Sequence, residues 1–356
     1  MARRTIYING SGCISPQSTL GNHHFLEKPV SVESNRLKAI DPNYKKFVPP
    51  EMVRRMGRII KMGVAAAKTC LADAGESTAD MIITATGLGC IEDTEKFLGK
   101  MIRDNEEFLT PTAFIQSTHN TVSAQIALLI KCHGYNFTYV HRGFSFETAI
   151  LDSLIQLQGG AANHILLGCA DELTNNSFQI QHRLGFWRKQ PVDNLLLFEH
   201  PAKGAIAGEG AAFFLLRNKK TLTSYALLKD VATLFNPASS SDIQTWIYAF
   251  LRENELEVQD LDLVISGKTG DSRFDHIYDE VFESTMPGIP TCLFKHLCGE
   301  YMTATGFAAW LAARILKQQE IPEATLPHGI PEELKHILIY NHYQGINHSL
   351  ILLSQV

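Results

Sequence analysis

The sequence predicts an α/β fold made of two similar layered halves, and three observations support this prediction. The same order of helix, strand, helix, strand and strand occurs twice along the 356-residue chain. Segments such as HILLG and LVIS are continuous apolar runs, as expected for strands that helices cover on both faces. A repeat with a period of about half the chain indicates a duplicated unit. We therefore expect a boundary near residue 220, with halves at 1–220 and 221–356.

The elements of the two halves correspond in order. RIIKMGVAAAKTCLADAG has apolar residues at helical spacing and leads into the strand-like MIITATGLG, just as DIQTWIYAFLRENELEVQDLD leads into LVISGKTG. Next, ETAILDSLIQLQGGAANHILLGCADE predicts a helix, a glycine break and a strand, and GFAAWLAARILKQQEIPE followed by KHILIYNHYQG repeats this order. GEGAAFFLLR and INHSLILLSQV each close a half with one more strand. Two such units side by side would place helices between the sheets.

Composition narrows the classes of function. The chain has 32 Lys and Arg residues against 37 Asp and Glu, with no basic block to neutralise a nucleic acid or a membrane surface. Its seven cysteines lack zinc-site spacing and predict reduced, buried thiols. No apolar run approaches the roughly 18 residues needed to span a bilayer. We expect a cytoplasmic protein without metal or cofactor and without nucleic-acid or membrane partners.

Several segments, in order along nearly the whole chain, resemble the β-ketoacyl-carrier-protein synthase (ketosynthase) family. INGSGCISP resembles its opening strand, RRMGRIIKMGVAAAKTCLADAG its first long helix, HILLGCADE its acidic strand end, and AIAGEGAAFFLL its Gly-Glu-Gly-Ala strand. KHLCGEYMTATGFAAWLAA resembles the segment that begins with a lysine and ends in a glycine-rich helix start. The resemblance implies a thiolase-like duplicated fold, a five-layer αβαβα sandwich.

One further segment points to a branch of that family. TPTAFIQSTHNTVSAQIAL is similar to a stretch in ketosynthase-like chain-length factors of aryl-polyene and flexirubin pigment synthesis. The resemblance places THNTVSAQIALLIKCHGYN and FTYV at the interface of a dimer. It also makes Phe114, Gln116, Thr118 and His119 candidates for tunnel-end or interface roles.

The family's nucleophile is missing from this sequence. An active ketosynthase carries a cysteine on a tight strand-to-helix turn, where the helix N-terminus favours the thiolate. Counting back from the Ala-Ile pair of YVHRGFSFETAI puts Gly143 at the cysteine position. If the count is off by one, Arg142 occupies the turn, and the nucleophile is still absent.

Two histidines of the family are also replaced. They stabilise the developing enolate and thioester oxygen by donating hydrogen bonds. In SGKTGDSRFD, Gly267 stands where the first histidine belongs, and in KHLCGEY, Lys295 is kept while Glu300 takes the second position. A carboxylate there would repel an enolate. The gating loop is shortened to NHYQGIN, in which Tyr343 is the remaining aromatic residue.

Several polar residues belong to this vestigial site according to the resemblance. His141 and Arg142 are expected there together with Glu147, as a polar cluster plugging the vacated pocket, and a Glu147–Arg142 pair is one arrangement. Lys295 and Glu300 are expected as a structural ion pair. The resemblance also places His342 near this vestigial site. A structural role is favoured over catalysis for all of them.

Taken together, these observations predict a ketosynthase-like protein without the Cys-His-His triad. The preferred hypothesis is a non-catalytic chain-length-factor-type subunit that partners an active ketosynthase and shapes the tunnel for a growing polyketide or polyene chain. Acyl carrier protein and an acyl chain are possible ligands. Two alternatives stay open: an acyltransferase, hydrolase or decarboxylase with altered chemistry using His141, Glu300 or His342, and a homodimeric acyl-binding protein.

Overall fold

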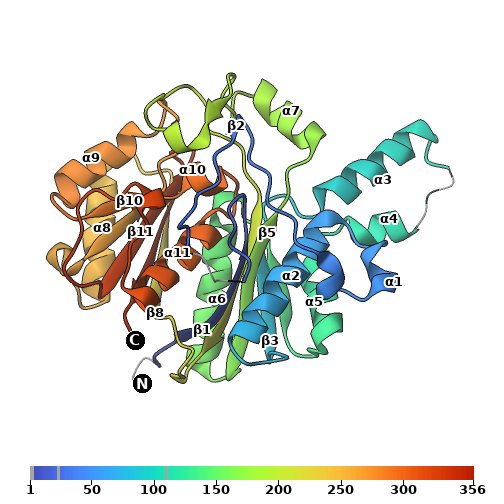
Figure 1. The fold of residues 1–356 in the computed structure, drawn as a ribbon, viewed down its shortest axis with the longest axis horizontal. Coiled ribbons are helices and arrows are strands. Elements are labelled where there is room, and N and C mark those ends of the chain that lie inside the picture. The colour runs from blue at the N-terminus through green and yellow to red at the C-terminus, as the bar shows by residue number, and fades with distance from the viewer. Residues whose placement is uncertain (1–3, 22–24, 108, 110) are drawn as a thin grey trace.

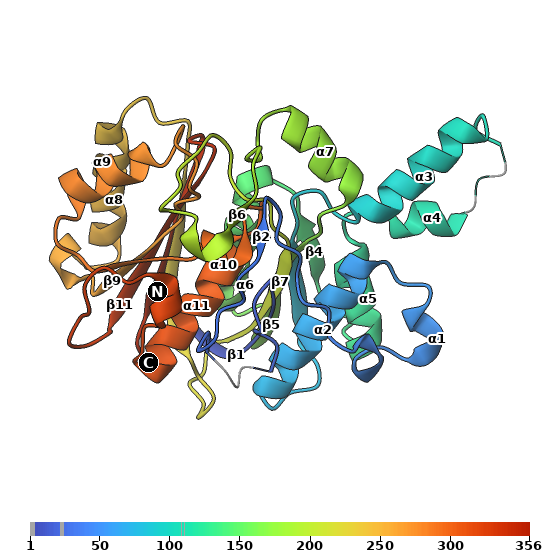
Figure 2. The ribbon, with the colours of Figure 1, turned by 45° about the horizontal axis from the view of Figure 1, so that its top comes forward.

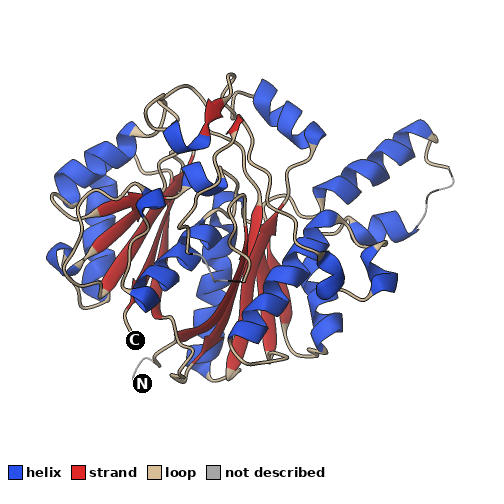
Figure 3. Cartoon of the chain, in the orientation of Figure 1, coloured by secondary structure: helices blue, strands red, loops and turns tan. Residues whose placement is uncertain are grey.

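The fold is a layered α/β sandwich, seen here in a computed structural model that describes residues 4–21, 25–107, 109 and 111–356. Figure 3 shows the strands in two fans, with helices between them and on their outer faces. Thr110, the first residue of the segment resembling chain-length factors, and Met1, Ala2 and Arg3 lie outside the described residues. Among the described residues, no helix has the length and apolar character needed to cross a lipid bilayer.

The N-terminal half contributes one fan of strands and the helices around it (Figure 1). Its strands in the main sheet are β1 (Tyr7–Ile14), β3 (Met81–Ala85), β4 (Asn136–Tyr139), β5 (His164–Asp171) and β7 (Gly210–Arg217). Its helices are α1 (Pro50–Val53), α2 (Arg58–Asp73), α3 (Ile91–Arg103), α4 (Pro111–Gln116), α5 (Thr121–Ile130), α6 (Ser145–Gly159) and α7 (Asn175–Arg183). The short strands β2 (Glu33–Ser34) and β6 (Val192–Asp193) form a separate two-stranded sheet.

The C-terminal half has a second fan with its own helices. The strands are β8 (Ala226–Phe235), β9 (Leu263–Ser266), β10 (Thr291–Leu293), β11 (His336–Tyr343) and β12 (Asn347–Ser354). The helices are α8 (Ser240–Glu253), α9 (His276–Thr285), α10 (Lys295–Cys298) and α11 (Thr305–Gln318).

The strand order is the same in both halves. The sheet runs β10-β9-β11-β12-β8-β1-β7-β5-β3-β4, and the two halves join through a short antiparallel pairing of β1 with β8. From its outer edge inward, each half has two parallel pairings followed by antiparallel ones. This repeated pattern supports the division into 1–220 and 221–356, which we keep as a proposal.

Helices form the outer and central layers of the sandwich. Helix α2 packs on β1, β5 and β7 at one outer face, and α8 and α9 cover the other. Helices α6 and α11 lie in the central layer and contact strands of both halves. Because α11 is enclosed on all sides, its residues from Thr305 to Leu316 are buried, and its sequence TGFAAWLAARIL is accordingly rich in small and apolar residues. The predicted five-layer arrangement is confirmed.

Glycine allows α2 to lie very close to the first strand. A Cβ atom on Gly12 of β1 would lie 2.8 Å from the backbone nitrogen of Cys70 in α2. No residue with a side chain fits that contact without a backbone shift. The INGSG sequence of β1 therefore fixes how the outer helix sits on the sheet.

One part of the N-terminal half extends away from the sandwich. Figures 1 and 2 both show α3 and α4 as an arm that projects from the body of the molecule. The ring of Phe97 in α3 contacts the ring of Phe114 in α4, with centroids 5.5 Å apart, and this contact holds the two helices together. The neighbouring Ile102 and Ile115 are exposed.

Candidate functional site

The strand-to-helix turn where the resemblance places the nucleophile lies between β4 and α6. A 3-10 turn at Arg142–Phe144 leads into α6, and the hydroxyl of Ser145 secures it by accepting from the backbone of His141 at 2.8 Å and donating to the Arg142 carbonyl at 2.8 Å. Arg142 has φ 50°, the left-handed conformation, whereas Gly143 does not. Sharp turns that raise a nucleophile commonly hold one residue in such a strained conformation. The strained corner thus falls on Arg142, and neither residue supplies a nucleophile.

The space beside Gly143 is occupied. A Cβ atom on Gly143 would lie 2.6 Å from Cβ of Tyr343 and 3.3 Å from Cβ of Asn347. Real Cβ atoms do not approach other atoms that closely, so a cysteine does not fit here unless the β11–β12 hairpin moves. Tyr343 thus packs directly on Gly143, the position where the family resemblance places the nucleophile.

The position of the first histidine is filled in the same way. A Cβ atom on Gly267, just after β9, would lie 2.5 Å from the hydroxyl of Tyr278 and would also collide with the Asn341 side chain. Tyr278 is fully buried, and its hydroxyl accepts a hydrogen bond from the backbone of His342 at 2.8 Å. A tyrosine from α9 therefore takes the volume that a histidine at 267 would need.

Lys295 and Glu300 form the ion pair that the sequence predicts. Lys295 Nζ lies 2.5 Å from Glu300 Oε2, and the side chains are 1% and 9% exposed. Burial raises the pKa of Glu300, while the adjacent Lys295 ammonium opposes that rise. A buried charge is tolerated when it is paired, so removal of either residue would leave the other as an unpaired buried charge. The carboxylate is engaged by its partner and is not a free base.

His342 is a buried, neutral ring in the same region. Its ring stacks on Tyr278 with centroids 4.3 Å apart, and its Nδ1 accepts a hydrogen bond from the backbone of Gly345 at 3.2 Å. Burial lowers the pKa of His342 well below its usual value, and the nearby His348 and Lys295 add to this effect. We therefore assign the proton of the neutral ring to Nε2, which has no hydrogen-bond partner among the described residues.

The expected cluster of His141, Arg142 and Glu147 does not form. Glu147, in the first turn of α6, points into the protein and accepts a hydrogen bond from Ser349 of β12 at 3.0 Å. Burial raises its pKa to about 7. His141 and Arg142 are exposed instead, and His141 Nδ1 lies 3.3 Å from the hydroxyl of Thr148. The side chains that fill the space beside Gly143 and Gly267 include the aromatic Tyr343 and Tyr278, and they do not include this polar cluster.

Little space remains at the vestigial site. A cavity of about 30 Å³ is lined by Glu172, Trp187, Glu300 and Tyr343 among others, and it is close in size to one water molecule. A larger hollow of about 660 Å³ lies between α9 and β10, and none of the vestigial residues line it. This cavity, among the described residues that line it, is too small for an acyl chain.

The tunnel and interface candidates lie on the projecting arm and at its junction with α5. Phe114 is exposed on α4, and Gln116 Nε2 donates to the Arg55 carbonyl at 2.6 Å. Thr118 shares a hydrogen bond with Thr121 at the start of α5. His119 packs against Gly89, in the loop after β3. None of these four residues has a described hydrogen bond to Lys295 or Glu300.

The acidic pair at the end of β5 has a structural role. Asp171 accepts from Gly87 at 2.7 Å and from the Thr303 hydroxyl at 2.8 Å, and so ties β5 to the segment before α11. Glu172 accepts from the backbone of Glu92 at 3.1 Å, and burial raises its pKa to about 7. Among the described residues, no group of three or more His, Cys, Asp or Glu side chains is arranged to hold a metal ion.

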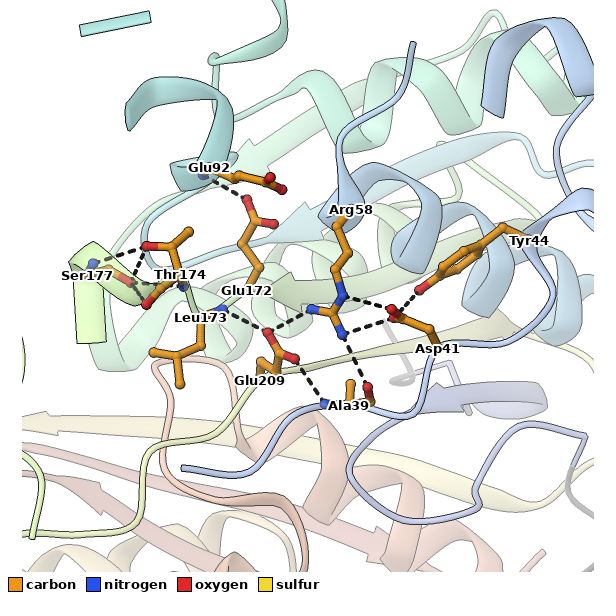
Figure 4. A network of polar contacts seen from close by, with 10 residues as sticks. All are labelled: Ala39, Asp41, Tyr44, Arg58, Glu92, Glu172, Leu173, Thr174, Ser177 and Glu209. Atoms are coloured by element: carbon orange, nitrogen blue, oxygen red, sulfur yellow. Dashed lines mark hydrogen bonds and ion pairs between the residues drawn. The ribbon is translucent and has the colours of Figure 1, made fainter. Parts of the chain in front are cut away.

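A polar network beside this strand end anchors the start of α2 (Figure 4). Arg58 Nη1 contacts the fully buried Glu209 at 2.8 Å, and Arg58 Nη2 contacts Asp41 at 2.9 Å. Glu209 also accepts from the backbone of Ala39 at 2.9 Å and of Leu173 at 2.8 Å. The glutamate of the GEGAA segment thus connects three separate parts of the chain, and it is not part of a nucleotide-binding loop.

This network yields a test of the structural role of Glu209. Arg58→Met should lower the free energy of unfolding by about 1.5–3 kcal/mol, because a buried carboxylate loses a charged partner but keeps its two backbone donors. Asp41→Asn is the matched control, and it should cost less than about 1 kcal/mol because Asp41 is half-exposed. Urea denaturation of both variants measures the difference. Equal losses would contradict the account.

The sequence did not reveal Tyr278 or Asn341 as parts of the site. Tyr278 lies in an ordinary amphipathic helix, and it reaches Gly267 and His342 only through the packing of α9 on β11. For Asn341 the sequence did contain a signal, because this residue belongs to the shortened NHYQGIN segment that resembles the gating loop. Asn341 and Tyr343 therefore come from a strand far in sequence from Gly267 and Gly143, whereas Tyr278 follows Gly267 by 11 residues but on a separate element.

Comparison with known proteins supports the resemblance to ketosynthases. Residues 31–192 match the family model for the N-terminal domain of β-ketoacyl synthases. A search of curated proteins found no significant match. Among solved structures, the ishigamide ketosynthase/chain length factor matches with a TM-score of 0.79 and 17% identity, covering 100% of both chains.

Two other solved structures are similar over nearly the whole chain. A β-ketoacyl synthase from Burkholderia phymatum STM815 has a TM-score of 0.81 and 17% identity, covering 99% of this chain and 100% of its own. The AntDE:AntF structure, a type II PKS acyl-carrier protein in complex with its ketosynthase bound to the hexaketide, has a TM-score of 0.78 and 14% identity with the same coverage. Residues 31–192 are thus similar to the β-ketoacyl synthase N-terminal domain, and the chain as a whole shares the thiolase-like fold of these solved structures.

Proposed function

We propose that the chain is a cytoplasmic, non-catalytic subunit of the chain-length-factor type, which pairs with an active ketosynthase in polyketide or fatty-acid synthesis of the aryl-polyene kind. The observation that carries this proposal is the refilled site. Gly143 and Gly267 lie under Tyr343 and Tyr278, and Glu300 is held by Lys295. A ketosynthase fold that lacks the nucleophile and both electrophilic histidines cannot use the family's covalent mechanism.

The outer edge of the N-terminal sheet supports a role in pairing. β4 is bonded to β3 on one side only, and it is the last strand of the sheet. Exposed apolar side chains lie on β4, just before it, and on both helices beside it: Phe137, Tyr135, Leu128, Leu151 and Ile155. An unpaired edge strand flanked by exposed apolar groups is a site for association with another chain. It is also where the family resemblance places the dimer interface.

The tunnel role is proposed for the arm beside that edge. Phe114 lies exposed on α4, and α4 leads through Gln116, Thr118 and His119 into α5. A partner that covers the edge of β4 would lie next to these residues. We propose that they contact either the partner or the end of its acyl chain, and that acyl carrier protein delivers that chain to the ketosynthase subunit.

The structure gives little support to an enzyme with altered chemistry. Such an enzyme needs an accessible base or electrophile with room for substrate. His342 is buried and neutral, Glu300 is paired, and the remaining cavity is about 30 Å³. His141 is exposed, but its ring contacts only Thr148 and Phe144 among the described residues. A homodimeric acyl-binding protein would also need a cavity for its ligand, and the cavity of about 30 Å³ at this site is too small for an acyl chain.

Association with an active ketosynthase tests the proposal. The purified chain should form a stable 1:1 complex with a ketosynthase subunit of a type II system, measured by analytical ultracentrifugation. Phe137→Asp should weaken that complex at least about tenfold, because it places a desolvated charge at the centre of the interface. Leu222→Asp, at a fully exposed residue in the loop between β7 and β8, is the matched control and should leave affinity unchanged. No complex with any of a panel of ketosynthases would refute the subunit role.

A further inference from the structure

The surface around β4 has an unusual distribution of charge. We define the edge surface as residues 121–159, which comprise α5, β4, α6 and their connections. Only two acidic residues occur in this range, Glu147 and Asp152, and they are 1% and 9% exposed. Asp152 accepts hydrogen bonds from Tyr135 and Gln156, and Glu147 accepts from Ser349. The edge surface therefore presents no free carboxylate to a partner.

Its basic residues are all exposed and lie at the two ends of the strand. Lys131 and His133 precede β4, and His141 and Arg142 follow it. Among the described residues, no carboxylate forms an ion pair with Lys131 or Arg142. The stretch between them, from Tyr135 to Val140, carries no charge and exposes apolar side chains. The edge strand is thus an apolar segment with positive charge at both ends.

We propose that this charge pattern selects the partner: β4 pairs with the edge strand of a different chain that carries carboxylates at both ends, and it disfavours pairing with a second copy of itself. The inference rests on the proposed function for the identity of the partner as a ketosynthase subunit. It goes further by stating the chemistry that the partner's edge strand must have and why a heterodimer is preferred.

The geometry of antiparallel pairing gives the reason. In a two-fold symmetric antiparallel pair, the start of β4 in one copy lies beside the end of β4 in the other, so the Lys131 end of each copy meets the Arg142 end of the other. Because the symmetry repeats each contact, a homodimer brings positive groups together at both ends of the interface.

A partner with acidic ends converts the same contacts into attractions. Like charges facing each other are a common device against unwanted pairing, and basic residues on exposed edge strands serve it often. Specificity between partners follows from the difference between the two sets of contacts. The exposed apolar centre supplies association energy for either pair, and the charged ends decide which pair forms.

The experiment uses an acid-flanked copy of this chain as the partner. Lys131→Glu, His133→Glu, His141→Glu and Arg142→Glu are combined in one variant, which keeps the apolar centre intact. Sedimentation equilibrium of wild type, of variant and of their mixture gives three dissociation constants. The mixed dimer should be at least about tenfold tighter than either homodimer at low salt. At about 1 M salt, where the Debye length is about 3 Å, this preference should largely disappear.

A second variant separates charge from folding. Glutamine at the same four positions removes the charges without reversing them, and its dimers with any partner should be intermediate in affinity. Thermal unfolding of all variants should match the wild type, because the four side chains are exposed. A wild-type homodimer as tight as the mixed dimer, a preference insensitive to salt, or no mixed dimer at all would overturn the inference. A ketosynthase that fails to bind would overturn the proposed function and leave the preference among copies unaffected.

Discussion

Replacing Lys295 with methionine should lower the free energy of unfolding by about 3–5 kcal/mol at neutral pH. The substitution leaves Glu300 buried without its counter-charge, and the ammonium that now opposes the rise in the pKa of Glu300 is lost. The same ammonium also lowers the pKa of the buried Glu147, so two carboxyl groups lose its field. Urea denaturation monitored by fluorescence measures the change.

The matched control replaces both partners. Lys295→Met combined with Glu300→Met removes the buried pair without leaving a charge behind, and it should regain most of the lost stability. Such recovery would show that the pair has a structural role. A double variant as unstable as the single one would show that Glu300 contributes independently of Lys295.

The single variant should also depend on pH in a defined direction. In the folded Lys295→Met protein, the pKa of Glu300 lies above its value in the unfolded chain, so the unfolded state is favoured when the carboxyl ionises. The loss in the free energy of unfolding is therefore fully present above the folded-state pKa of Glu300, and it decreases as the pH falls toward the ordinary pKa of glutamate. Denaturation at several pH values between about 4 and 8 should show that the difference in free energy of unfolding between this variant and the wild type becomes smaller at acidic pH.

Restoring the family's nucleophile and first histidine should damage the fold rather than recover catalysis. Gly143→Cys combined with Gly267→His should lower the free energy of unfolding by about 2–6 kcal/mol, the sum of two overpacked positions. The added cysteine meets Tyr343, and the added imidazole meets Tyr278 and Asn341. Mass spectrometry should detect no acyl group on the introduced thiol after incubation with acyl-loaded carrier protein.

Gly99 offers a matched control for the added cysteine. It lies in helix α3, and a Cβ atom there would meet nothing within 4 Å. Gly99→Cys should therefore be neutral or slightly stabilising, because the helix loses a flexible residue. If Gly143→Cys were as stable as Gly99→Cys and became acylated, the site would be open and the account of a refilled pocket would be wrong.

The sequence predicted those features that depend on local patterns. Apolar periodicity located the helices and strands of both halves, and their order indicated the layered fold. The replacements at Gly143, Gly267 and Glu300 were predicted because each position lies in a short segment that resembles a family motif with fixed neighbours. Lys295 and Glu300 were predicted as a pair because the resemblance places a carboxylate where the partner of the retained lysine belongs, and the ion pair is confirmed.

Features that depend on long-range packing were not predictable in the same way. Glu147 was expected near Arg142, but α6 directs its side chain inward to Ser349, which is 202 residues away in sequence. Tyr278 fills the space at Gly267 only because α9 packs on β11. The exposure of the edge surface follows from the position of β4 at the end of the sheet, and a list of elements does not give that position.

The most direct test of the central claim is the length of the acyl product. Malonyl- and acyl-loaded carrier protein are incubated with this chain alone, with an active ketosynthase alone, and with both, and the products are identified by mass spectrometry. We expect no product from this chain alone, and we expect products of altered length when both proteins are present. Condensation by this chain alone, or an unchanged product length in a confirmed complex, would contradict the account.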